Sequence, residues 1–552
     1  MKRMDLRAEG LDALGAAGAL AFTGMSFGVQ QGVITPYAFL SIVALLGGLM
    51  LMGLIRRWDA RAFGRASVIA GAVILALGTF ALSHDTPLNE NVSGRMTVAL
   101  VSLPVFWVLL AGLRMGMQGL NTAEPTRCPP VRAAVITALY TTACLALSWM
   151  KVYPAGSSPD VTQQLAQIRG EMPLNDLHPL AHTLLLKALL CIWDSSAMII
   201  LAHILMITLL YGLFAYVLCQ RGVRLGWILL AVSIFTACES PASAYVFPWK
   251  DTPYAFAVGL LTLCLIRLTE DGARFTVFRA VMIGMALAGT MLLRFNGVVI
   301  VLVVGLWLAV WSVRRRCWKP LAATACTVAL CVAGVYGYGY GVLGAKSPEN
   351  GFSIQVFGAG IAAMSNAPEG ELSEQERAEI AQYLDPAWMA EHYYPWEARK
   401  LIWDYETDDP EGLFDDPEMK MMNNRFVLAL GQYKREIVAL YFRLMPRHLA
   451  VCAREVLYDT YAVWGWERGP QIGYNHVLLA VLLLVAAGAS WGRADVRRRG
   501  IILAPVFCNA ASVAISAITN ETRYLLPMHT LFPMLLLYIL CTRGKGAKDN
   551  AL

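Results

Sequence analysis

The sequence predicts an all-α polytopic membrane protein, for three reasons. Of its 552 residues, 57% are hydrophobic and only 15% are charged, whereas soluble globular proteins carry about 25% charged residues. The apolar residues form runs of roughly 20, the length that crosses ~30 Å of hydrocarbon as a helix. The runs are continuously apolar instead of alternating, which argues against a β-barrel.

About fourteen transmembrane helices are predicted, because backbone in hydrocarbon must satisfy its own hydrogen bonds. The first apolar run is too long for a signal peptide and a second follows it at once, so we expect it to be retained. The predicted spans are 11–31, 35–55, 67–83, 96–113, 131–150, 196–218, 225–246, 253–268, 278–293, 297–313, 321–343, 476–491, 500–518 and 524–541.

The loops between these spans alternate in charge, which predicts their orientation. Basic loops mark the cytoplasmic side of a membrane protein, and here they would be 56–65, 114–132, 221–224, 267–279, 314–319, 493–499 and 543–548. The loops left outside are short or acidic: 84–95, 151–195, 247–252, 344–475 and 519–523. Both termini are therefore expected in the cytoplasm, with the one large polar region outside.

Composition also excludes two classes of site. The net charge of +6 is accounted for by the basic cytoplasmic loops, so it does not indicate nucleic-acid binding. Most of the twelve cysteines lie inside apolar spans, and no CxxC motif or Cys/His cluster occurs. The sequence therefore predicts neither a disulfide framework nor a zinc site.

The first large outer loop, 151–195, contains Asp160, Asp176 and His178. An amphipathic helix should follow Asp160, and the apolar stretch 180–191 is too short to span, so it should lie in the membrane interface. Asp160 could alternatively be a helix cap and Asp176 a turn residue beside proline.

Further charged residues lie within or beside the spans. Glu239 is inside span 225–246, where carboxylates usually face a cavity. Lys250 and Asp251 follow at the outer interface, where a plain loop salt pair is the alternative.

Two outer arginines contradict the positive-inside bias. Arg294 divides two apolar runs, and Arg523 follows Glu521 in the last outer loop. Snorkelling is one explanation for such an arginine, and a phosphate contact is the other. The outer interface would thus gather carboxylates and cations, a set suited to a phosphorylated lipid: cations hold the phosphate, and a carboxylate acts as general base.

Five short segments resemble the GT-C superfamily of membrane glycosyltransferases, with the closest likeness to a bacterial GT-C-like group. They are Asp160, 175–179 (Asn-Asp-Leu-His-Pro), 249–254 (Trp-Lys-Asp-Thr-Pro-Tyr), 294–297 (Arg-Phe-Asn-Gly) and 521–525 (Glu-Thr-Arg-Tyr-Leu). The resemblance covers roughly 131–541. It implies a bacterial cytoplasmic (inner) membrane location, a polyprenyl-phosphate-linked sugar as donor, an active site facing outward, and a catalytic Asp on the first outer loop.

By this resemblance Asp160 is the base. Many relatives carry a tight acidic pair in that loop, whereas Asp160 and Asp176 are far apart in this sequence, so either could be catalytic. Lys250, Arg294 and Arg523 would bind the donor phosphate, and His178, Glu239, Asp251 and Glu521 would shape the site. No cofactor is required, although oxygen ligands would suit Mg²⁺ or Mn²⁺.

Four regions are expected: a four-helix membrane extension (1–130), the GT-C-like core (131–343), an extracytoplasmic region (344–475) and the C-terminal spans (476–552). The third region is acidic between 369 and 425, with Trp388, Tyr393, Tyr394, Trp396, Trp403 and Tyr405 interleaved. Its aromatic content predicts short helices instead of a disordered tail. The aromatic residues could bind a glycan or form the core of a small lid.

The predicted function is sugar transfer to a cell-envelope glycan, lipid or protein acceptor. The alternative is a multi-pass transporter or flippase for a lipid-linked or anionic solute, which the number of spans and Glu239 would suit. Transporters often have repeated halves and midplane sites, but the sequence shows no repeat and its unusual charges lie at one face. A non-catalytic scaffold is a third option, which leaves the outer Arg and Asp residues without a role.

Overall fold

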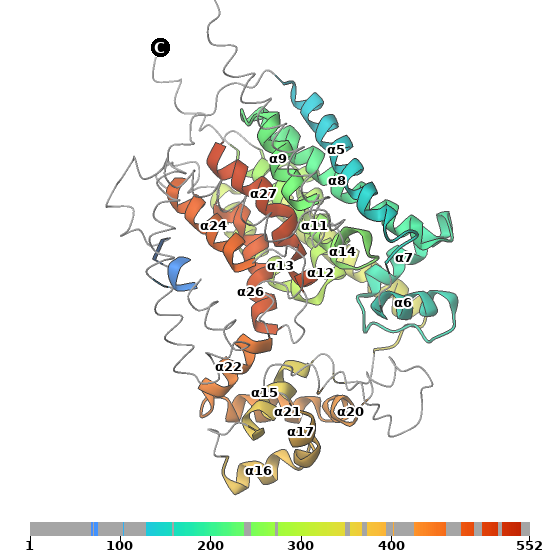
Figure 1. The fold of residues 1–552 in the computed structure, drawn as a ribbon, viewed down its shortest axis with the longest axis vertical. Helices are drawn as coiled ribbons and strands as arrows, with labels where there is room; N and C mark the ends of the chain where they lie inside the picture. Colours follow the sequence, from blue (N-terminus) through green and yellow to red (C-terminus); the bar gives the residue numbers. More distant parts are fainter. Residues whose placement is uncertain are drawn as a thin grey trace, which may run out of the picture.

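The computed structural model describes residues 128–156, 159–236, 244–270, 274–347, 354–366, 372–393, 424–459, 476–490, 500–516 and 522–541, with isolated positions at 68–69, 71–74, 103, 351 and 401. Within these residues every regular element is a helix (Figure 1). The predicted all-α class is therefore confirmed for the described part of the chain.

Six of the described helical segments are long and apolar enough to cross a membrane. They are Pro130–Met150 (α5), Ser196–Gln220 (α8), Asp251–Leu268 (α11), Phe295–Arg315 (η4 and α13), Trp318–Val342 (α14 and η5) and Arg523–Leu540 (η8 and α27). Each matches a predicted span.

Four other predicted spans coincide with shorter helices: α9 (Leu225–Thr236), α12 (Val277–Leu293), α24 (His476–Ser490) and α26 (Ala504–Ser516). The first four predicted spans lie almost wholly outside the described residues. The total of about fourteen and the orientation in the membrane stay predictions.

Helices α11 and α12, which follow one another in the chain, run in opposite directions, and helix termini of the membrane part gather at two ends. Helix α11 begins at Asp251, and the adjacent α12 returns and stops before Arg294, so these two residues meet at one end. At the other end Arg221, just after α8, pairs with Glu270, just after α11, at 3.0 Å. The core between the two ends is apolar and contains the fully buried Tyr211, Phe214 and Tyr254.

Two short helices of the first large loop, α6 (Pro159–Arg169) and α7 (Leu180–Ile192), lie together beside one end of α5 and α8 (Figure 1). Gln164 ties them to each other: its Nε2 donates to Thr183 Oγ1 at 2.7 Å, and its Oε1 lies 2.9 Å from His182 Nδ1. The predicted amphipathic helix after Asp160 and the short apolar helix after it are both present.

A separate helical lobe, residues 354–459 where described, has its own core, which includes Ile361, Met389 and Leu430. Its helices are α15 (Gln355–Asn366), α16 (Glu374–Ile380), α17 (Pro386–His392), α20 (Arg425–Gln432), α21 (Lys434–Leu444) and α22 (Leu449–Asp459). Local caps start the shortest helices, since Ser373 and Glu376 form a capping box on α16 and Asp385 caps α17.

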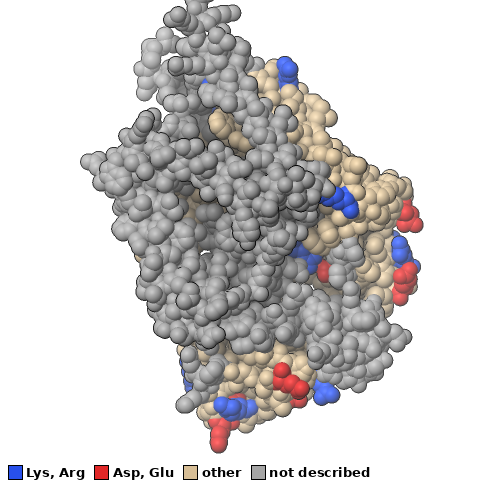
Figure 2. Space-filling model, viewed as in Figure 1, with Lys and Arg blue, Asp and Glu red and all other residues tan. Residues whose placement is uncertain are grey.

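The lobe lies beyond the end of the membrane part, and α22 contacts α26 (Figure 1). Acidic and basic side chains cluster on the visible surface of the lobe, whereas much of the described surface of the upper helices is uncharged (Figure 2). This contrast fits a lobe in water and helices in lipid.

Candidate functional site

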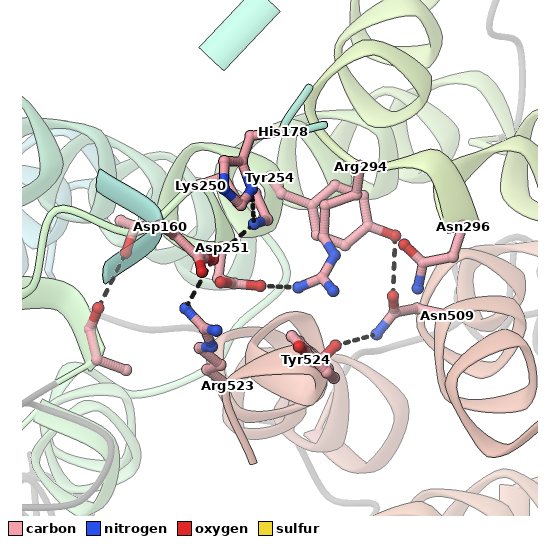
Figure 3. A network of polar contacts seen from close by, with 12 residues as sticks. Asp160, His178, Lys250, Asp251, Tyr254, Arg294, Asn296, Asn509, Arg523 and Tyr524 are labelled. Carbon is pink, nitrogen blue, oxygen red and sulfur yellow. Dashed lines mark hydrogen bonds and ion pairs between the residues drawn. The ribbon is translucent and has the colours of Figure 1, made fainter. Parts of the chain in front are cut away.

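The candidate site is built around Asp160, in the first turn of α6. Lys250 Nζ lies 2.8 Å from Asp160 Oδ2, and Arg523 Nη1 lies 3.3 Å from the same oxygen (Figure 3). All three side chains are largely buried, with exposed fractions of 15% for Asp160, 13% for Lys250 and 11% for Arg523. One carboxylate is thus shared by two cations that follow it by 90 and 363 residues in the chain, as their numbers show.

His178 joins the cluster through both of its ring nitrogens. Its Nδ1 lies 3.3 Å from Lys250 Nζ, and its Nε2 lies 2.9 Å from Gln163 Oε1. An ammonium can only donate, so Nδ1 accepts and the proton sits on Nε2, which donates to Gln163. Burial, together with the charge of Lys250, lowers the pKa of His178 to about 3. The imidazole is therefore neutral at physiological pH.

Asp251 and Arg294 form a second ion pair beside the first (Figure 3). Asp251 is the first residue of α11 and is fully buried, and Arg294 directly follows α12. The chain turns so tightly after Arg294 that a Cβ added to Gly297 would lie 1.9 Å from the carbonyl oxygen of Thr290. Glycine at this position allows the turn that brings the guanidinium to Asp251.

Aromatic rings hold both guanidinium groups. The Arg294 guanidinium carbon lies 4.2 Å from the centre of the Tyr524 ring, and that of Arg523 lies 5.0 Å from the centre of the Trp249 ring. Such contacts favour a cation and fix its plane. Asn509 on α26 positions Tyr524, since its Nδ2 donates to the Tyr524 carbonyl oxygen at 3.2 Å.

Asn509 in turn accepts a 2.8 Å hydrogen bond from the hydroxyl of Tyr254 on α11. Sequence reasoning missed Asn509 and Gln163. A buried amide in the middle of an apolar run was the available signal for Asn509, because such a group needs partners. Gln163 gave no comparable signal, since glutamine is ordinary in an amphipathic helix.

Among the residues that the structure describes, the paired groups of this cluster carry more positive than negative charge. Three cations, Lys250, Arg294 and Arg523, face two carboxylates, Asp160 and Asp251, and His178 is neutral.

The pKa directions agree with this imbalance. Burial alone would raise the pKa of Asp160, but the charges of Lys250 and Arg523 hold it well below its usual value. Burial lowers the pKa of Lys250, and Asp160 does not offset this fully because Arg523 and Arg294 also lie near. The described cluster is therefore prepared for an anion.

Asp176 does not take part in these ion pairs. Its Oδ2 accepts a 2.5 Å hydrogen bond from the Tyr340 hydroxyl, and its backbone N–H donates to the Lys346 carbonyl oxygen at 3.2 Å. It thus ties the first large loop to the end of the segment Trp318–Val342. Glu239 and Glu521, which were predicted to shape the site, lie outside the described residues.

Among the residues that the structure describes, no three His, Cys, Asp or Glu side chains gather as metal ligands. No protein-family profile matches the chain, and no curated protein or solved structure matches it either. The functional argument therefore depends on the sequence and on the geometry of the cluster.

Proposed function

We propose that the protein is a membrane glycosyltransferase that moves a sugar from a polyprenyl-phosphate donor to a cell-envelope glycan, lipid or protein acceptor. In this proposal the cluster faces outward from the bacterial cytoplasmic membrane, as the positive-inside pattern predicts. The observation that carries it is the Asp160 cluster: one largely buried carboxylate shared by two cations, at one end of a bundle of apolar helices.

The three cations would bind the donor phosphate. Guanidinium groups suit phosphate because their donors match its oxygens in pairs, and Lys250 adds a point charge. In a largely buried site these interactions are stronger than in water. They would act most on the developing charge as the phosphate leaves, which is when stabilisation accelerates the reaction.

Asp160 would act as the general base. The acceptor hydroxyl oxygen forms a bond to the anomeric carbon of the sugar, and its proton passes to the Asp160 carboxylate. The bond between the anomeric carbon and the phosphate oxygen breaks, and its electron pair leaves with the polyprenyl phosphate. Lys250, Arg294 and Arg523 then balance the charge on that leaving group.

The ion pairs of Asp160 explain how this base would be controlled. In the free protein two cations hold its pKa low, so it accepts a proton poorly. A bound phosphate would draw on the same cations and make the carboxylate more basic. Asp176 lacks this link to the cations, which favours Asp160 as the base.

The test is donor turnover by the full chain in nanodiscs, with short-chain polyprenyl-phosphate sugars and membrane extract as the source of acceptor. We expect wild type and Asp176→Asn to consume a donor, and Asp160→Asn to lose about 10²–10⁴-fold of the rate, the usual contribution of a general base. Asp194→Asn is the matched control, because Asp194 is an exposed carboxylate near α7.

Two results would contradict the proposal. Equal donor turnover by wild type and Asp160→Asn would show that Asp160 is not the general base. The transporter would be favoured instead if the protein, reconstituted in vesicles, moved an intact lipid-linked solute across the membrane without cleaving any donor.

A further inference from the structure

The helical lobe contains a cavity of about 430 Å³ between the start of α17 and helix α20. Small-molecule sites usually measure ~300–1,000 Å³, so the cavity is large enough for a ligand of one or two rings. It lies in the lobe, whereas the Asp160 cluster lies in the membrane part.

Aromatic rings form much of the wall of this cavity. Trp388 and Phe426 are almost completely buried and stack at 6.1 Å between ring centres. Tyr383 and Tyr433 are half-buried, with ring centres 5.4 Å apart and planes tilted by 59°. The first pair belongs to the core of the lobe, and the second leaves ring surface at the cavity.

Polar side chains line the cavity beside these rings. Gln382, Asp385 and Arg425 all line it and are exposed. Asp385 is also fixed in place, because its Oδ1 accepts hydrogen bonds from the backbone N–H groups of Ala387 at 3.0 Å and Trp388 at 3.2 Å. A carboxylate held by a helix cap presents its polar group without further loss of side-chain entropy.

We propose that this cavity binds a saccharide ring. The C–H face of a sugar packs on the electron-rich face of an aromatic ring, and its hydroxyl groups can exchange hydrogen bonds with the amide, carboxylate and guanidinium groups. A wholly apolar ligand would displace water from those polar groups without replacing its hydrogen bonds, which costs free energy. A phosphate would meet the charge of Asp385 as well as that of Arg425, so the mixed charges favour a neutral ligand.

The saccharide would be part of the glycan acceptor, and this identification rests on the proposed glycosyltransferase function. Binding in the lobe would hold an acceptor glycan on the protein while its terminal hydroxyl reaches the membrane site. The cavity itself requires no donor, so its binding can be measured separately.

The test is saturation-transfer NMR on the full chain in nanodiscs, which avoids sugar-based detergents. The probes are maltose, cellobiose and the N-acetylglucosamine disaccharide, with glycerol phosphate as an anionic comparison. We expect transfer to the ring C–H protons of at least one saccharide. Ala429→Trp, which fills the cavity, and Tyr433→Ala should each weaken its binding roughly tenfold or more.

Phe442→Ala is the control, since Phe442 is 54% exposed on the same lobe and does not line the cavity. Each variant is used only if its thermal unfolding matches wild type, and Gln382→Ala, an exposed position, replaces any that does not fold. No transfer from any saccharide up to ~10 mM, a concentration that would detect weak binding, would overturn the inference. Unchanged binding in Ala429→Trp would overturn it too.

The outcomes separate this inference from the proposed function. Asp160→Asn should bind the saccharide as wild type does. If binding is present but no donor is consumed, the cavity is a saccharide site and the glycosyltransferase proposal fails. If donor is consumed but no saccharide binds the lobe, the glycosyltransferase proposal stands and the saccharide site in the lobe is refuted.

Discussion

Replacing Lys250 by methionine tests whether the charge network around Asp160 exists as described. Methionine keeps most of the length of the lysine side chain and removes its charge. Asp160 then keeps Arg523, whose Nη1 is 3.3 Å away, as its nearest cation. A largely buried carboxylate would therefore be left with less compensating charge, which should destabilise the folded protein.

The expected loss follows from the burial of the pair. Removing one partner of a buried ion pair costs about 3–5 kcal/mol. The lower value applies here, because Asp160 and Lys250 retain 15% and 13% exposure and Arg523 remains. We expect Lys250→Met to lower the free energy of unfolding by about 3 kcal/mol.

A double-mutant cycle isolates the interaction itself. Asp160→Asn removes the carboxylate, and in the double variant Asp160→Asn with Lys250→Met neither charge is left. We expect the two single losses to exceed the loss in the double variant by about 2 kcal/mol, within the usual range for contacting residues. The measurement is unfolding by SDS titration, followed by circular dichroism.

The pH dependence gives an independent check. The pKa of Asp160 is lower in the folded protein than in the unfolded chain, so its ion pairs stabilise the fold fully above the unfolded value of about 3.9. This contribution is lost as the pH falls through the folded pKa. The part of the Lys250→Met deficit that comes from Asp160 should stay constant between pH 5 and 8 and shrink in stronger acid. A coupling below about 0.5 kcal/mol, or a deficit unchanged in acid, would refute the network.

Three further predictions concern the same site. The pKa of His178 is about 3 in the folded protein and about 6.5 in the unfolded chain, so on acidification the unfolded chain binds a proton at this residue first. Lowering the pH from 7 to 5 should therefore destabilise wild type more than His178→Gln. Equal losses of stability in SDS titrations of the two proteins would contradict this. Gly297→Ala should displace Arg294, because the added Cβ would lie 1.9 Å from a backbone oxygen. This variant should weaken donor binding, measured by fluorescence polarisation, at least about tenfold. The control Gly305→Ala, whose added Cβ has nothing within 4 Å, should bind the donor as wild type does. Turnover should survive EDTA if the three cations suffice for the phosphate, and a loss restored by Mg²⁺ or Mn²⁺ would instead add a divalent ion to the mechanism.

Sequence reasoning grouped five charged residues that the structure brings together, although they lie between residues 160 and 523, but it also grouped Asp176, which does not join their ion pairs. The useful signal was energetic: charges beside apolar runs, and arginines on the side where the positive-inside bias disfavours them. Lys250, Asp251, Arg294 and Arg523 carried this signal, whereas Asp160 was selected as a carboxylate of the first large outer loop and by the resemblance. The structure brings all five together. Their catalytic and binding roles stay predictions.

The sequence could not predict the pairing within this group. Lys250 and Asp251 are neighbours and could have paired with each other, but each contacts a different partner, because one precedes α11 and the other is its first residue. The separate position of Asp176 also depends on packing, since it follows from the approach of Tyr340 to the loop. Such contacts are fixed by how helices cross, which charge patterning along a sequence does not specify.

The composition of the cluster itself argues for a ligand. Ion pairs this buried contribute little net stability, since apolar residues of the same size often stabilise a fold equally well or better. Burial and the nearby Arg523 and Arg294 lower the pKa of Lys250, so the three described cations repel one another in the free protein. Binding a phosphate would add negative charge beside these cations and offset their mutual repulsion. A phosphorylated donor should therefore raise the stability of wild type, and it should do so less in Lys250→Met, where one of the three cations is gone.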